Sequence, residues 1–238
     1  MSTPRPDAPS GSRLVVAVDG PSGSGKSSVC RAVATRLGLR YLDTGAMYRA
    51  LTWWALEQGV DLADPATRPQ VAELARRLPL GMSQSAASST VTVDGQDVSA
   101  AIRDPRISGL VSAVATNLEV REELVRRQRE IVRDGSGIVV EGRDITTVVA
   151  PDADVRVLLT ASEEARLARR ALEVHGTDDA VALDRTRDHV VRRDAQDSTV
   201  VTFTEAADGV TVVDSSALTF EETVEAVLAL VRADAGRP

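Results

Sequence analysis

Short apolar runs alternate with longer amphipathic segments along most of the chain. Residues 14–18 are apolar at every position and rich in valine. Similar short runs occupy residues 39–42, 137–141, 155–159 and 210–213. A run that is apolar on both faces is typical of a strand buried in a parallel sheet, and the segments between the runs have apolar residues at helical spacing. This alternation predicts an α/β fold with a five-stranded parallel sheet flanked by helices.

Capping residues predict where several helices begin and end. Thr44 can cap a helix that runs to about Gln58 and stops at Gly59. Residues 219–222 read Thr-Phe-Glu-Glu, a capping box for a C-terminal helix. Ser162 begins a polar, arginine-dense stretch that extends to about residue 197, in which we expect two helices joined near His175-Gly176.

The pattern changes between residues 61 and 103. Residues 90–98 alternate β-forming residues around Asp94-Gly95, which predicts an antiparallel hairpin with a tight turn. Antiparallel pairing inside a parallel α/β chain indicates an inserted subdomain over 61–103. The core is then formed by 14–60 and 104–238. Residues 1–13 are rich in Pro and Ser without an apolar core, and we expect a disordered tail there and not a signal peptide.

Composition excludes several classes of function. The chain has 238 residues, is 43% hydrophobic and carries a net charge of −7, which argues against general binding of nucleic acid. One cysteine and two histidines exclude a disulfide framework and a Cys/His zinc site, and Cys30 is interpreted as a small packed hydrophobe. No run approaches 18 apolar residues, so we expect no membrane span and a cytoplasmic protein.

A phosphate-binding motif follows the first strand. Residues 20–27 match G-x-x-x-x-G-K-[ST] without a mismatch, between a buried strand and a helix. In this context backbone N–H groups face phosphates, Lys26 supplies a charge for the β- and γ-phosphates, and the Ser27 hydroxyl can ligate Mg²⁺. The nucleotide-binding segment is expected to comprise Gly20, Pro21, Ser22, Gly23, Ser24, Gly25, Lys26, Ser27 and Ser28. The sequence therefore predicts a P-loop nucleotide binder.

The rest of the chain favours a kinase among P-loop proteins. An Asn-Lys-x-Asp guanine reader, which a GTPase would need, is absent from the sequence. Arg166, Arg169 and Arg170 share one face of a predicted helix. Such a segment could close over a triphosphate and stabilise the charge on the transferring group, so we expect a lid over about 162–200. The alternative is a basic helix exposed to solvent.

Several motifs together resemble the bacterial cytidylate kinase family. They are Asp19–Lys26, Leu42–Arg49, Glu141–Asp144 with Thr147–Val149, Asp97–Ser99 with Ile102-Arg103, and Val120-Arg121 with Arg127–Arg129. The resemblance extends from residue 14 to the C-terminus. It implies phosphorylation of CMP and dCMP by ATP with Mg²⁺, on a nucleoside-monophosphate kinase core with a monophosphate-binding insert and a mobile lid.

The resemblance also implies roles for individual residues. On the phosphate side, Thr44 contacts the monophosphate, and the acceptor phosphate is clamped by Arg49, Arg143 and Arg193. On the base side, Tyr48 lies against the ring, and the cytosine edge is read by Ser112, Arg121 and Asp144. The ribose is held by Asp197. The catalytic set is expected to be Lys26, Arg143, Arg166, Arg170 and Arg193. Cytosine presents an N4 donor beside N3 and O2 acceptors, which a carboxylate or hydroxyl and an arginine complement. As alternatives, Arg121 is an exposed helix arginine and Ser112 a small packing residue. Asp43 and Glu141 either orient the water shell of the metal or cap strand ends, and we favour Asp43 as a substrate-site residue.

The lid departs from the family pattern at one position. After Arg193-Asp194 and Asp197, Val200 stands where the family has an arginine. The change leaves the reaction class unaffected, and we expect weaker discrimination in favour of cytosine. Two other interpretations remain open. One is a P-loop kinase for another small acceptor, such as UMP, AMP or a non-nucleotide alcohol. The other is a nucleotide-dependent binding switch that hydrolyses ATP only incidentally. For the favoured (d)CMP kinase we expect a monomer.

Overall fold

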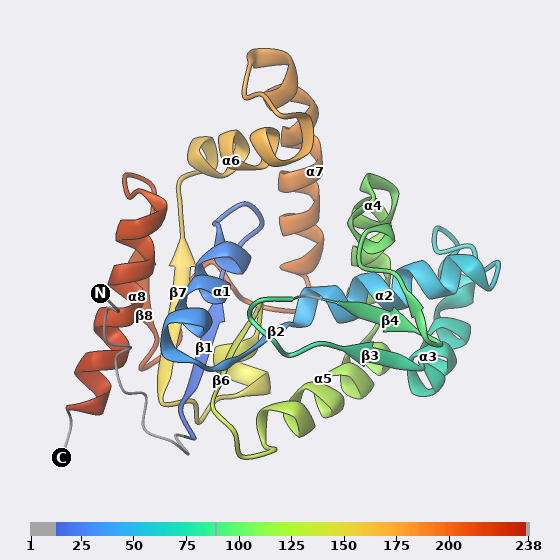
Figure 1. The fold of residues 1–238 in the computed structure, drawn as a ribbon. Helices are drawn as coiled ribbons and strands as arrows, with labels where there is room; N and C mark the ends of the chain where they lie inside the picture. Colours follow the sequence, from blue (N-terminus) through green and yellow to red (C-terminus); the bar gives the residue numbers. More distant parts are fainter. Residues whose placement is uncertain (1–12, 89, 237–238) are drawn as a thin grey trace.

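Within the residues described by the structure, a computed structural model covering 13–88 and 90–236, five parallel strands form the central sheet (Figure 1). The strands are β1 (Val15–Asp19), β2 (Arg40–Asp43), β6 (Ile138–Gly142), β7 (Val155–Thr160) and β8 (Thr211–Asp214), in the order β2-β6-β1-β7-β8. The helices are α1 (Lys26–Leu37), α2 (Thr44–Glu57), α3 (Arg68–Arg77), α4 (Pro105–Ala115), α5 (Leu118–Val132), α6 (Glu163–His175), α7 (Ala180–Asp197) and α8 (Phe220–Ala235). The predicted five-stranded α/β fold is confirmed. The expected tail lies outside the described residues, Arg13 excepted.

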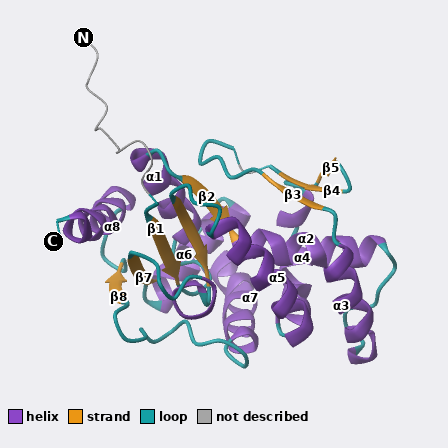
Figure 2. Ribbon diagram, turned by 90° about the horizontal axis from the view of Figure 1, so that it is seen from below, coloured by secondary structure: helices purple, strands orange, loops and turns teal. Residues whose placement is uncertain are grey.

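The apolar strands are buried because helices cover both faces of the sheet (Figure 2). Val16 and Val18 of β1 point into a cluster formed with α1 and α8. Ala17, between them, points into a second cluster formed with α2, α4 and α5. Successive strand residues face opposite sides, so a strand between two layers of helices has to be apolar at every position.

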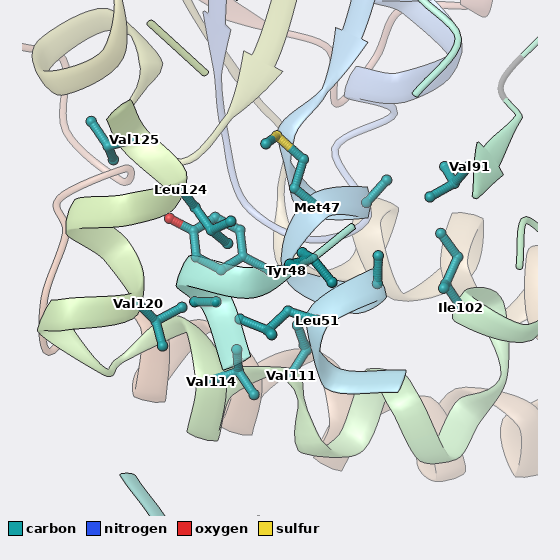
Figure 3. Close-up of a cluster of buried hydrophobic side chains, with 14 of the residues drawn as sticks. Met47, Tyr48, Leu51, Val91, Ile102, Val111, Val114, Val120, Leu124 and Val125 are labelled. Carbon is teal, nitrogen blue, oxygen red and sulfur yellow. The ribbon is translucent and has the colours of Figure 1, made fainter. Parts of the chain in front are cut away.

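The second cluster joins the core to the segment 61–103. Figure 3 shows Met47, Tyr48 and Leu51 of α2 among apolar side chains of α4 and α5, with Val91 and Ile102 beside them. The segment therefore shares a continuous hydrophobic core with α2. Its separate status as a subdomain stays a prediction.

An antiparallel sheet lies within this segment. The expected hairpin forms between β4 (Val91–Val93) and β5 (Gln96–Asp97), with Asp94 and Gly95 both at positive φ in the turn. A third strand, β3 (Leu80–Met82), pairs with β4 and was not expected. Leu80-Gly81-Met82 is too short for its alternation to stand out in the sequence.

Two local features differ from expectation. Asp43 and not Thr44 caps α2, because the Asp43 carboxylate accepts from the N–H of Ala46 at 2.9 Å. The Thr44 hydroxyl instead donates to the backbone oxygen of Glu141 at 2.8 Å. A π-helical turn, Ile145–Val149, follows β6, and the buried carboxylate of Asp19 accepts from its first two N–H groups at 2.7 and 2.8 Å.

The remaining caps were as expected. Ser162 caps α6, Gly176 ends it in the left-handed conformation, and Thr219 and Glu222 form the capping box of α8. The two helices expected over 162–197 are α6 and α7. Both stand above the carboxyl ends of the sheet strands (Figure 1).

Candidate active site

The predicted site residues converge at the carboxyl edge of the parallel sheet. Asp19 at the end of β1 is in register with Gly142 of β6, and Asp43 at the end of β2 is in register with Glu141. Each strand leads directly into a chemistry-bearing segment: the P-loop after β1, α2 after β2, and Arg143-Asp144 after β6. This edge is where open α/β sheets bind ligands.

Close approach of backbones explains two glycines of the P-loop. A Cβ on Gly20 would lie 2.1 Å from the carbonyl oxygen of Leu159. Gly23 has a φ of 78°, and a Cβ there would lie 2.6 Å from the carbonyl oxygen of Arg166 on α6. The loop is thus confined between β7 on one side and α6 on the other, and only glycine fits at either position.

Lys26 is the first residue of α1 and is half-buried against the loop that precedes it. Its ammonium donates to the backbone oxygen of Pro21 at 3.0 Å, which holds the side chain back along the P-loop. Burial lowers the pKa of Lys26, and the nearby Glu141 carboxylate opposes that shift. A half-buried cation that donates to a backbone oxygen is suited to take an anionic ligand, because the ligand supplies the compensating charge.

Oxygen donors for a magnesium ion lie beside Lys26. Burial and the neighbouring Asp43 carboxylate raise the pKa of Glu141, which accepts a hydrogen bond from the Tyr41 hydroxyl at 2.6 Å and one from the Ser27 hydroxyl. In the described part of the chain, no group of three His, Cys, Asp or Glu side chains could hold a metal by itself. Mg²⁺ in kinases takes one or two protein oxygens and completes its shell with phosphates and water, so Ser27, Glu141 and Asp43 fit this ion.

The arginines assigned to the acceptor phosphate lie opposite the P-loop. Arg49 pairs with Asp43 at 2.8 Å. Arg143 pairs with Asp194 at 2.8 Å and with Asp197 at 3.0 Å, and its guanidinium lies 4.2 Å from the centroid of the Phe203 ring. Burial, together with the neighbouring arginines, lowers the pKa of Arg193 to about 10. The three guanidinium groups are partly desolvated and offer several N–H donors, which suits a phosphate dianion.

Of the residues assigned to the cytosine edge, Ser112 and Asp144 are buried and Arg121 is half-buried. Arg121 forms an ion pair with Asp144, whose pKa is raised by burial and lowered in part by Arg121. The Ser112 hydroxyl donates to Asp197 at 2.8 Å. The exposed-helix interpretation of Arg121 is therefore wrong. Tyr48 packs in the hydrophobic cluster of Figure 3, with its hydroxyl within electrostatic reach of Asp144.

The lid arginines contact the P-loop. Arg166 donates to the backbone oxygen of Ser22 at 3.0 Å, and Arg169 donates to that of Ser24 at 3.4 Å and of Ser215 at 2.6 Å. Arg170 is half-buried on the same helix and acts electrostatically on Arg193. This face of α6 is not exposed to solvent, so the alternative of a solvated basic helix is wrong.

Three functional positions were missed by sequence reasoning. Asp194 bridges Arg143 and Arg166, Phe203 packs against Arg143, and Asp19 holds the turn after β6. The sequence feature that could have identified Asp194 is its spacing from Asp197. Residues three apart on a helix share one face, so both carboxylates point to the same side. Phe203 gave no signal, since its contact partner lies 60 residues away in the chain.

The position of the missing lid arginine borders an open space. Val200 is half-buried and lines a cavity of about 360 Å³ together with Asp144, Thr147 and Phe203. An arginine at this position would extend a cation toward Asp144. Because position 200 is a valine, the cation that pairs with Asp144 is Arg121.

A P-loop beside half-buried arginines at the carboxyl edge of a parallel sheet defines a P-loop phosphotransferase of the nucleoside-monophosphate kinase type. The chain belongs to the cytidylate kinase family, whose model matches residues 16–233. It is 51% identical over 221 residues to a cytidylate kinase of Cutibacterium acnes, covering 92% of this chain and 96% of that one. It is 50% identical over 218 residues to a cytidylate kinase of Nocardia farcinica, covering 89% and 90%. The resemblance inferred from the motifs is confirmed.

A solved structure supports the fold at much lower identity. An uncharacterized protein from Eubacterium ventriosum superimposes with a TM-score of 0.50 at 11% identity, over 94% of this chain and 99% of that one. This likeness concerns the fold alone. No helix in the described residues is both long and apolar enough to cross a membrane.

Proposed function

We propose that the protein transfers the γ-phosphoryl group of ATP to CMP or dCMP, giving ADP and CDP or dCDP. The observation that carries the proposal is the placement of Lys26 in the P-loop opposite Arg143 and Arg193 at one sheet edge. Besides burial, Arg143 and Arg193 lie close enough to Lys26 to lower its pKa, which supports a common anionic ligand for the three cations. Membership of the cytidylate kinase family supports the same reaction.

On the donor side, the P-loop binds and orients ATP. Residues 22–28 present backbone N–H groups at the start of α1, where the helix dipole favours phosphate. Lys26 exchanges its bond to Pro21 for the β- and γ-phosphates. Arg166 and Arg170 on α6 approach the γ-phosphoryl group from above and stabilise the charge that spreads over its oxygens during transfer.

Mg²⁺ would be held by the Ser27 hydroxyl together with the ATP phosphates, and would neutralise charge between the β- and γ-phosphates. Glu141 and Asp43 are placed to accept hydrogen bonds from water molecules around it. Burial and the Asp43 carboxylate raise the pKa of Glu141, whereas the burial of Asp43 is outweighed by Arg49 and the N–H of Ala46, which lower the pKa of Asp43.

On the acceptor side, arginines position the monophosphate as the nucleophile. Arg49, Arg143 and Arg193 surround it, and Thr44 lies at the start of α2 beside it. A phosphate dianion is already an adequate nucleophile, so the site requires positioning and charge neutralisation and no general base.

The base and ribose are read by the buried group described above. Arg121 donates toward N3 and O2 of cytosine, and Asp144 and Ser112 accept from N4. Asp197 holds the ribose hydroxyls, and Tyr48 supports the base from the hydrophobic cluster. Uracil reverses the hydrogen-bonding pattern at N3 and at position 4, which would leave buried groups unpaired.

ADP release in a coupled assay tests the function. We expect strict dependence on a monophosphate acceptor, with CMP and dCMP preferred over UMP and AMP. An acceptor preference for UMP, AMP or an alcohol would identify another P-loop kinase. ADP release that is independent of every acceptor would identify a nucleotide-dependent switch. The proposal takes the protein to act as a monomer in the cytoplasm, where both nucleotides are available.

A further inference from the structure

Asp194 on α7 joins three parts of the site through one carboxylate. Its Oδ1 lies 2.8 Å from a guanidinium nitrogen of Arg143 and accepts from the N–H of Ser22 at 3.3 Å. Its Oδ2 pairs with Arg166. None of the roles assigned above uses this residue.

The partners of Asp194 belong to opposite halves of the reaction. Arg166 lies on α6 and also donates to the backbone oxygen of Ser22, so it is fixed to the donor cradle. Arg143 follows β6 and is held on its other sides by Asp197 and the Phe203 ring, so it belongs to the acceptor pocket. The side chains of Asp194, Arg143 and Arg166 are each 14% exposed, which excludes most of the solvent from the bridge.

Electrostatics explains why a carboxylate is needed between these arginines. Two guanidinium groups close together in a partly desolvated site repel each other, and their separation would fluctuate. A carboxylate with one oxygen on each guanidinium offsets this repulsion and fixes their relative position. Phosphoryl transfer depends on that position, because donor and acceptor phosphates must be aligned for in-line attack.

We propose that Asp194 is a positioning residue that links Arg166 on the donor side to Arg143 on the acceptor side, so that binding of one nucleotide organises the site for the other. This inference rests on the proposed function and deepens it. The bridge joins α7 to the P-loop as well, through Ser22. The lid helices therefore carry part of the geometry on which both substrates depend.

Kinetics and binding on the full chain test the inference. In Asp194→Asn the shape is kept and the charge is lost, so we expect kcat to fall by about 10- to 100-fold, as for misplacement of reacting groups by about 1 Å. Binding of ATP alone or of CMP alone should change by less than about threefold, since the contact is not made to either substrate. The KM for CMP at saturating ATP should rise by about fivefold or more, because the coupling between the two sites is lost. Asp184→Asn, an exposed carboxylate on the same helix, is the matched control and should behave as wild type.

Calorimetry measures the link between the two sites directly. CMP is titrated with and without a saturating non-hydrolysable ATP analogue. We expect the analogue to tighten CMP binding at least about fivefold in the wild type, within the usual range of coupling between sites, and to have almost no effect in Asp194→Asn. Asp194→Glu keeps the charge and should retain more of both kcat and coupling than Asp194→Asn. Thermal unfolding of each variant checks that it is folded.

Several results would overturn the inference while leaving the proposed function intact. One is a kcat and a coupling in Asp194→Asn that equal those of the wild type. Another is a loss of kcat and coupling that is equally large in Asp194→Asn and Asp194→Glu. Tighter binding of the ATP analogue to Asp194→Asn with unchanged kcat would also overturn it, because it would show Asp194 as a competitor that occupies the place of a phosphate. A wild-type protein without CMP-dependent phosphoryl transfer would instead refute the proposed function.

Discussion

The donor and acceptor sides of this site are built in opposite ways. The phosphate cradle of the donor side is one continuous segment of the chain, residues 20–28, and side chains of α6 and α7 reach it from elsewhere. The acceptor side draws its groups from α2, α4, α5, α7 and the loop after β6, and holds them by ion pairs such as Arg121–Asp144 and Arg143–Asp197. A backbone cradle depends on its fixed glycines and on one side chain, Lys26, whereas an assembled pocket depends on each ion pair.

The largest effect is expected from Lys26, the one charged side chain of the donor cradle. Lys26→Met removes the charge on the transferring group and should lower kcat on the order of 10²–10³-fold, as loss of a transition-state donor does. The melting temperature should be unchanged or slightly higher, because a half-buried cation is replaced by an apolar side chain of similar length. Arg36→Met, an exposed residue on the same helix, is the control. Activity above about a tenth of wild type would contradict the assignment of Lys26.

Backbone packing of the donor cradle can be broken by a single methyl group. In Gly20→Ala the new Cβ would meet the carbonyl oxygen of Leu159, and neither backbone can move freely. We expect a loss of about 3 kcal/mol in the free energy of unfolding, as for overpacking of a core. The melting temperature should fall by roughly 9 °C for a chain of this size.

Gly109→Ala provides the comparison for that measurement. Gly109 lies inside α4 with no atom near the place of a Cβ. Alanine there should stabilise the protein by about 0.5–1 kcal/mol, because glycine loses more backbone entropy in a helix. Equal melting temperatures for the two variants would show that the close approach of the Gly20 and Leu159 backbones does not restrict position 20 to glycine.

Base selectivity tests the acceptor side. Two mismatched hydrogen-bonding positions should place kcat/KM for UMP about 10²–10⁴ below that for CMP, and nearer 10² because Val200 replaces an arginine. Asp144→Ala should lower the efficiency with CMP far more than with UMP and narrow the ratio by about tenfold. Competing-substrate kinetics measures both ratios, with Asp152→Ala, an exposed aspartate, as control. A parallel loss for both nucleotides would mean that Asp144 serves phosphate positioning and not base recognition.

The smallest effect is expected at Phe203, which supports an acceptor-side arginine from behind. Phe203→Leu keeps the position apolar and removes the ring under Arg143. A cation–π contact of this kind contributes about 1 kcal/mol, so KM for CMP should rise about fivefold with little change in KM for ATP. Phe220→Leu, with a side chain exposed on α8, should leave both values unchanged. An equal rise in both KM values would show that Phe203 supports the whole lid and not the acceptor side.

Local patterns in the sequence determined the sheet, most helices and the P-loop. The strand 15–19 is apolar on both faces because two layers of helices cover it, and G-x-x-x-x-G-K-[ST] needs no distant partner to form a cradle. The motifs also identified the family, and they placed Arg143, Asp144 and Asp197 in the site. These features depend on residues that are neighbours in the chain, so their signal is present in any short window of the sequence.

The tertiary structure decided which of these groups meet. Asp194 became a bridge because α7 crosses above the P-loop, and Phe203 became a support for Arg143 because the loop after α7 passes beneath it. Capping of α2 by Asp43 and not Thr44 followed from the pairing of β2 with β6, which brings the Thr44 hydroxyl to the carbonyl of Glu141. Ion pairs and ring contacts are short-ranged and depend on where separate elements pack. No spacing along the chain encodes that placement.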